Sequence, residues 1–165
     1  MIRALLICVV LIGTLGQAVA AQEKQTTTAN AACTFQDGKE MSVRYNPALF
    51  DKDKEDSFSD RQMFLFTQTP LSIGDKEIPA GAFSLYLMQK GKTWTLIINK
   101  NVTRGPKYDE NQDLARVSMQ LGEIDSDAKQ LEILFAHGAP KQCNLRVYQG
   151  HTGAWAEFKE TGPNK

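Results

Sequence analysis

The sequence predicts an exported all-β protein, an antiparallel β-sandwich of about eight to ten short strands behind an N-terminal signal peptide. Three observations lead to this prediction. An apolar run follows a single positive charge at the N-terminus. Apolar and polar residues then alternate with the period of half-buried strands through most of the chain. No segment carries a sustained helical apolar stripe.

The N-terminal segment has the three parts of a secretory signal. Arg3 supplies the positive charge, the apolar run covers residues 4–16, and Ala18-Val19-Ala20 places small residues before a cleavage point. The run is shorter than the roughly 20 residues that a membrane-spanning helix needs. We therefore expect cleavage after Ala20, no transmembrane segment in the mature chain, and a periplasmic or extracellular location. An uncleaved N-terminal anchor is the alternative.

Length and composition limit the remaining possibilities. The chain has 165 residues, which supports one folded domain, and 42% of them are hydrophobic, too many for a disordered chain. Nineteen basic residues balance nineteen acidic ones. This balance argues against a general nucleic-acid binder, which needs a basic face to neutralise phosphates.

Polarity sets the expected boundaries within the mature chain. Residues 21–32 form a polar, flexible leader, residues 33–160 the sandwich domain, and residues 161–165 a polar tail. Within the domain, residues 51–60 are mostly charged and are expected to form a solvated loop.

Two hairpins are the clearest elements. Asp37-Gly38 is a turn between a strand that begins at Cys33 and an alternating strand from Met41 to Tyr45. Farther along, Phe83, Leu85 and Leu87 alternate with polar neighbours, a Lys-Gly-Lys turn follows, and Trp94, Leu96 and Ile98 alternate in return. The apolar sets of the second hairpin predict a core that includes Trp94.

The remaining expected strands are shorter and separated by turn-rich segments. They cover 62–68, 71–73, 114–120, 130–136, 143–149 and 154–159, with turns at 122–128 and 150–153 and an irregular connection at 101–111.

Export would determine which cysteines remain in the mature chain. Cys8 leaves with the signal peptide, so Cys33 and Cys143 remain, and two cysteines in an oxidising compartment favour a disulfide. Two buried free thiols are the alternative. A zinc site built on two cysteines alone is not expected, because structural zinc takes four ligands.

Several motifs resemble a known family. The runs Ile78-Pro79-Ala80-Gly81-Ala82-Phe83-Ser84-Leu85 and Trp94-Thr95-Leu96-Ile97-Ile98-Asn99-Lys100 resemble the bacterial secreted family called domain of unknown function 2911. The opening hairpin at 33–39, Tyr108-Asp109-Glu110 with Asp113 and Arg116-Val117, and Cys143-Asn144-Leu145-Arg146 also fit, so the resemblance covers roughly 33–159. It implies an extracytoplasmic β-sandwich and brings no established activity.

One departure from the family pattern affects a possible shared site. Members carry a polar segment with a Trp-Arg-Thr-Gly-Ala-Asn-like core before the Pro-Ala-Gly hairpin. Here residues 56–63 stand in that place, and only Asp60 and Arg61 keep comparable polar character. A polar site built on that segment would be lost or altered in this chain.

The sequence offers little for catalysis. His137 and His151 are the candidate bases, both in glycine-containing loops, and no Gly-x-Ser-x-Gly nucleophile elbow occurs. The carboxylates of residues 51–56 do not match a calcium-binding EF-hand loop, and no phosphate-binding glycine motif is present. We therefore expect no cofactor, no metal and no catalytic residue.

Aromatic residues are the candidates for binding. Tyr86, Tyr148 and Trp155 are expected to point outward by alternation, and a row of exposed aromatics can stack sugars or dock a partner. His151 completes this set of candidate binding residues. Alternatively, the aromatics cover the outer face of the sheet or pack under a loop.

The function predicted from these patterns is a non-catalytic module of the cell envelope that binds an unknown protein or a small ligand. Two alternatives remain: a degenerate or metal-dependent hydrolase-like enzyme, and a structural component of the envelope. An enzyme would require His137 or His151 to meet a carboxylate in a concave pocket. A docking module would require a large exposed apolar patch.

Overall fold

The structure is a computed structural model that describes residues 28–49, 62–103 and 108–162. The predicted signal peptide, most of the predicted leader, the charged loop at 51–60 and the polar segment at 56–61 lie outside the described residues. No helix of the described part is long and apolar enough to cross a membrane.

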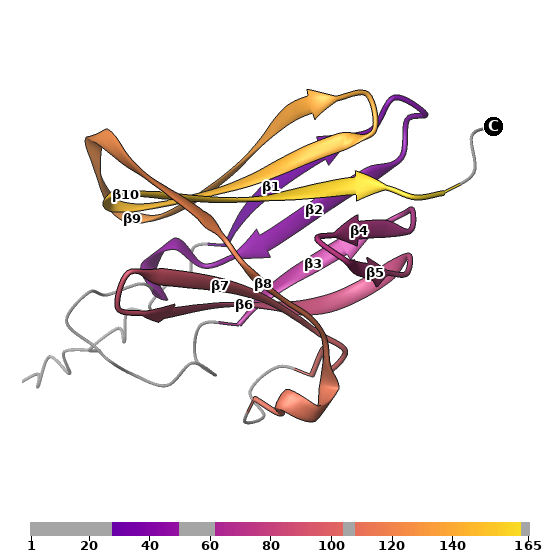
Figure 1. Ribbon diagram of the computed structural model, residues 1–165, viewed down its shortest axis with the longest axis horizontal. Coiled ribbons are helices and arrows are strands. Elements are labelled where there is room, and N and C mark those ends of the chain that lie inside the picture. The colour runs from indigo at the N-terminus through magenta and orange to yellow at the C-terminus, as the bar shows by residue number, and fades with distance from the viewer. Residues whose placement is uncertain (1–27, 50–61, 104–107, 163–165) are drawn as a thin grey trace, which may run out of the picture.

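Ten strands of the described part form two antiparallel sheets, which confirms the predicted β-sandwich (Figure 1). Sheet A has six strands in the order β1 (Ala29–Thr34), β2 (Glu40–Tyr45), β3 (Met63–Thr67), β6 (Gly81–Lys90), β7 (Thr93–Asn99) and β8 (Asp113–Ser118). Sheet B has four, in the order β5 (Lys76–Ile78), β4 (Leu71–Ile73), β10 (Gln142–Glu160) and β9 (Gln120–Ala139). Two short 3-10 turns, η1 (Pro47–Leu49) and η3 (Glu110–Gln112), complete the elements.

The first hairpin follows from alternation and its turn. Met41, Val43 and Tyr45 of β2 are buried while the residues between them are more exposed. Gly38 adopts a positive φ of 86° in the turn, where a side chain would be strained. β1 begins at Ala29, four residues before the expected start at Cys33, because Ala31 also points into the core and pairs with Val43.

The second predicted hairpin is confirmed as β6 and β7. Leu85 lies opposite Ile98 and Leu87 opposite Leu96, so the two alternating sets share the inner face. Trp94 is buried in the same core cluster, with 7% of its surface exposed. Gly81 opens β6 at φ 153°, a conformation that favours glycine.

One apolar core lies between the sheets. Sheet A supplies Met41, Val43, Leu65, Leu85, Leu96 and Ile98, and sheet B supplies Leu71, Ile73, Leu131, Ile133, Leu145, Val147 and Phe158. The disulfide between Cys33 on β1 and Cys143 on β10 joins the two layers with a Cα–Cα distance of 6.3 Å, as the sequence predicts. A buried hydrogen bond also crosses the sandwich, from the Ile133 N–H to Tyr45 Oη at 3.1 Å.

The predicted turns at 122–128 and 150–153 are wrong, because β9 and β10 continue through them as long strands. The two strands stay paired from Gln142↔Ala139 to Trp155↔Gln120, with register shifts on either side of Gly150. Gly150 has φ 60°, and the shifts let the ribbon change direction without breaking its ladder. Figure 1 shows the two-stranded β9–β10 ribbon doubling back at this corner, which divides β10 into a first arm before Gly150 and a second arm after it. The Glu160 N–H, at the end of the second arm, donates to the carbonyl of Lys141, next to the start of the first arm, at 2.8 Å.

Candidate functional site

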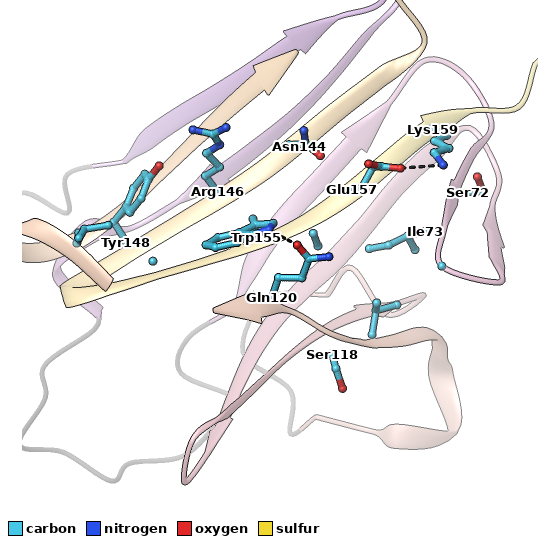
Figure 2. A pocket seen from close by; sticks show the side chains of 15 residues that line it. Ser72, Ile73, Ser118, Gln120, Asn144, Arg146, Tyr148, Trp155, Glu157 and Lys159 are labelled. Atoms are coloured by element: carbon cyan, nitrogen blue, oxygen red, sulfur yellow. Dashed lines mark hydrogen bonds and ion pairs between the residues drawn. The ribbon is translucent and has the colours of Figure 1, made fainter. Parts of the chain in front are cut away.

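The bent β9–β10 ribbon frames a groove on the outer face of sheet B, with a volume of about 630 Å³ (Figure 2). That volume is in the usual range for small-ligand sites. Its walls come from β4, the end of β8, the start of β9 and both arms of β10. The lining residues are Ser72, Ile73, Gly74, Val117, Ser118, Gln120, Ile124, Asn144, Arg146, Tyr148, Gly153, Trp155, Ala156, Glu157 and Lys159.

The register shift at Gly150 brings both arms of β10 to the groove. Before the shift, Cys143, Leu145 and Val147 point into the core and the even-numbered residues between them point outward. After it, the even-numbered Ala154, Ala156 and Phe158 are buried, and odd-numbered residues face out. Asn144, Arg146 and Tyr148 therefore line the same groove as Trp155, Glu157 and Lys159.

Two glycines make room for the groove aromatics. A Cβ atom added at Gly122 would lie 2.9 Å from Cη2 of Trp155, so the indole rests against the bare backbone of β9. At Gly153 an added Cβ would lie 3.2 Å from Cε1 of Tyr148. The indole Nε1–H of Trp155 donates to Gln120 Oε1, which anchors the ring at one edge. Both aromatic side chains are half-buried, so each keeps surface available to a ligand.

The charges along the groove leave one cation unpaired within the described part of the chain. Lys159 Nζ lies 2.8 Å from Glu157 Oε1, and Gln142 Nε2 donates to the other oxygen of that carboxylate. The exposed Arg146 has no side-chain partner among the described residues. The groove therefore offers an aromatic platform, amide groups and a guanidinium that no described side chain occupies.

The structure divides the predicted binding residues. Tyr148 and Trp155 line the groove together, on opposite arms of β10. His151 is exposed at the ribbon corner and does not line the groove. Tyr86 lies on β6 in the other sheet with 2% of its surface exposed, so the expected outward row of three aromatics is wrong.

Tyr86 is buried because a residue remote in sequence covers it. The Tyr108 ring meets it edge-on, with ring centroids 5.2 Å apart. Burial raises the pKa of the Tyr86 phenol. Alternation places Tyr86 on the outer face of its strand, but it cannot reveal what packs over that face.

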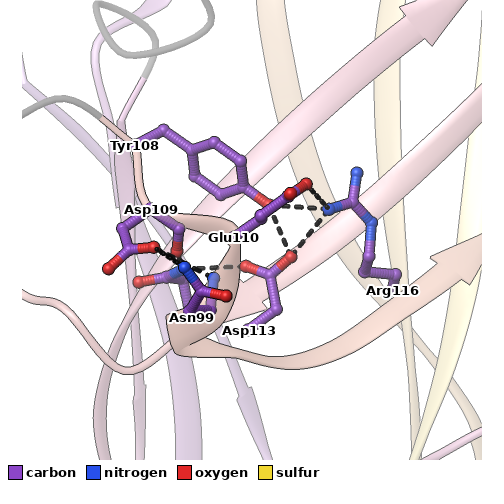
Figure 3. A network of polar contacts seen from close by, with 7 residues as sticks. Asn99, Tyr108, Asp109, Glu110, Asp113 and Arg116 are labelled. Atoms are coloured by element: carbon purple, nitrogen blue, oxygen red, sulfur yellow. Dashed lines mark hydrogen bonds and ion pairs between the residues drawn. The ribbon is translucent and has the colours of Figure 1, made fainter.

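Tyr108 also belongs to a polar network at the edge of sheet A (Figure 3). Its Oη donates to Asp113 Oδ2 at 2.5 Å, and Arg116 Nη1 donates to both of these oxygens at 2.8 Å. Asn99 Nδ2 donates to Asp113 Oδ1 and to the Asp109 carbonyl, each at 2.8 Å. Burial and the hydrogen bond to Asp113 raise the pKa of the Tyr108 phenol far above its usual value, so it stays a protonated donor. These residues bind one another and share none of the groove lining, so we assign the network to holding η3 between β7 and β8.

The two candidate histidines lie outside the groove. Both are exposed, neither lines the groove, and neither contacts a carboxylate within residues 28–49, 62–103 and 108–162. His137 instead lies beside the disulfide, with both ring nitrogens 3.8 Å from Cys33 Sγ.

Sequence reasoning missed the polar half of the groove. Asn144 and Arg146 appeared only within the family-like run Cys143-Asn144-Leu145-Arg146, and Gln120, Glu157 and Lys159 carried no motif. One signal in the sequence could have revealed the corner: the apolar residues of the strand pattern occupy odd-numbered positions before Gly150 and even-numbered positions after it.

Comparison with family models matches residues 59–156 to a protein family of unknown function, DUF2911. The chain belongs to this family. The DUF2911 match runs from before β3 into the second arm of β10, so it includes the polar network and most of the groove, while the β1–β2 hairpin and Cys33 precede it. No curated protein and no solved structure gives a significant match to this DUF2911 chain.

Proposed function

We propose that this protein is an exported, non-catalytic binding module of the cell envelope and that the groove of sheet B binds a saccharide carrying a carboxylate. The observation that carries the proposal is the pairing, in one concavity, of a half-buried Trp155 platform with Arg146, which has no side-chain partner among the described residues. The concave shape favours a small ligand over a flat protein surface.

The chemistry of the lining supports this ligand class. An indole that lies against backbone presents a flat, rigid, apolar surface, which suits the C–H face of a sugar ring. The amides of Gln120 and Asn144 can donate to and accept from ring hydroxyls. A guanidinium binds a carboxylate through two parallel hydrogen bonds, so Arg146 would select an acidic sugar over a neutral one.

Binding should depend on Trp155 and Arg146 separately. By isothermal titration calorimetry with an acidic oligosaccharide, Trp155→Ala should weaken binding about tenfold or more, equivalent to about 1.4 kcal/mol. Gly122→Ala should also weaken it, because the new methyl group must displace the indole. Arg146→Gln should remove the preference for acidic over neutral sugars while some affinity remains.

His151→Ala is the matched control, because His151 is exposed on the same strand but outside the groove. It should bind like the wild type. Equal binding by wild type and Trp155→Ala would contradict the assigned site, and an unchanged preference in Arg146→Gln would contradict the acidic ligand.

Export should remove residues 1–20. The signal-like N-terminus and the Cys33–Cys143 disulfide support this part of the proposal, since disulfides persist in oxidising compartments. Intact-mass analysis of exported protein should give a chain that starts at Ala21 with no free thiol. A mass that retains residues 1–20 would instead indicate an N-terminal anchor.

A further inference from the structure

The disulfide and His137 place three potential metal ligands in one cluster. Cys33 Sγ, Cys143 Sγ and one ring nitrogen of His137 all lie within 4.8 Å of one another. Register produces this arrangement, because His137 on β9 pairs directly with Cys143 on β10, while Cys33 approaches from the opposite sheet. The cluster shares no residue with the groove, so it is independent of the proposed saccharide site.

We propose that reduction of the disulfide converts this cluster into a three-coordinate site for monovalent copper. Metal–sulfur and metal–nitrogen bonds of about 2.3 and 2.0 Å, set at a trigonal angle, separate nitrogen from sulfur by roughly 3.7 Å. The ring nitrogens of His137 already lie 3.8 Å from Cys33 Sγ. The spacing between nitrogen and sulfur therefore suits a bridging metal, once rotation of the reduced cysteine side chains has separated the two sulfur atoms to roughly 4.0 Å.

The ligand set favours Cu(I) over zinc. Soft thiolates select Cu(I), imidazole also suits copper, and three protein ligands complete a three-coordinate Cu(I) site, whereas zinc needs a fourth ligand, from the protein in a structural site or from water in a catalytic one. Within the described residues the cluster holds three His, Cys, Asp or Glu side chains and no fourth. The cysteines are buried and His137 is exposed, so the imidazole stands at the solvent side of the site where an ion would enter.

The reaction balances with a dithiol as reductant. The dithiol passes two electrons and two protons to the Cys33–Cys143 bond and becomes a disulfide itself, leaving two thiols on the protein. Cu(I) then bonds to both sulfur atoms and displaces one proton from each thiol. A neutral ring nitrogen of His137 supplies the third bond. Reoxidation of the cysteines would expel the ion, so the site exists only in the reduced protein.

Competition with a coloured Cu(I) chelator tests the proposal. The full mature protein is reduced with a dithiol, desalted without oxygen and titrated against the Cu(I)–bicinchoninate complex. Reduced wild type should withdraw one equivalent of copper, and oxidised wild type none. His137→Ala should weaken uptake by at least about tenfold, because even the loss of groups that only orient a ligand costs about 10–100-fold.

His151→Ala is the matched control and should behave like the wild type, because His151 is remote from the disulfide in the cross-strand register. Cys33→Ser should abolish uptake. Equal uptake by oxidised and reduced protein, or no uptake by either, would overturn the proposal. Equal affinity of reduced wild type and His137→Ala would overturn it too, including the case in which a reduced, unfolded chain binds copper through its cysteines alone.

Discussion

Trp94→Ala is expected to destabilise the domain by about 3–5 kcal/mol, the usual cost of removing a large aromatic from a core. Trp94 has 7% of its surface exposed and belongs to the single apolar cluster between the sheets. It also lies where β7 meets the end of β8, because its carbonyl accepts from the Met119 N–H at 2.8 Å. The cavity would thus open beside the chain crossing from sheet A to sheet B.

A loss of that size is comparable with the whole stability of a weak domain, about 5 kcal/mol. Thermal melts should show a fall in Tm of roughly 10–20 °C. His137→Ala and His151→Ala serve as controls and should melt close to the wild type, since both side chains are exposed. A near-wild-type melt for Trp94→Ala would contradict its assignment to the core.

Removal of the disulfide in a Cys33→Ala/Cys143→Ala variant should cost about 2–5 kcal/mol. The bridge spans 110 residues of sequence and connects β1 to β10, one strand from each sheet. Without the bridge, the unfolded chain gains conformational entropy, which stabilises the unfolded state. For a loop of about 100 residues the chain-entropy model puts this loss of folding stability at about 4.7 kcal/mol.

Urea unfolding of the double variant against the oxidised wild type measures this cost. Alanine keeps both positions small and apolar, so lost packing adds little to the loss of the cross-link. Coincident unfolding curves would show that the bridge contributes nothing to stability.

The strands with simple alternation were predictable from sequence. β2, β6 and β7 each bury one face, and glycines at positive φ mark the turns beside them at Gly38 and Gly91. The family resemblance rests on the same central hairpin, and the family match confirms it. Local pattern suffices there because each hairpin partner is the next strand in the chain.

The β9–β10 corner was not predictable in the same way. Gly122, Asp125, Ser126 and Asp127 have turn-forming composition, yet they lie within β9, where the ladder to β10 continues. Bulges around Gly150 absorb the change of direction, which is a property of the strand pair rather than of either strand.

The site was only half predictable for the same reason. Trp155 and Tyr148 stood out as large residues on outward positions, but their convergence depends on the fold of the ribbon. Tyr86 had the same sequence signal and is buried, because Tyr108 packs against it from a segment beyond β7. A side chain's partners across the fold decide its exposure, and alternation does not encode them.

The indole N–H signals in a two-dimensional proton–nitrogen NMR spectrum test the groove most directly. The chain has two tryptophans, Trp94 in the core and Trp155 in the groove, so each reports on one location. Titration with an acidic oligosaccharide should shift the Trp155 signal, because its N–H donates to Gln120, another residue of the groove lining. The Trp94 signal should stay in place. An unmoved Trp155 signal at saturating ligand would contradict the groove as the binding site.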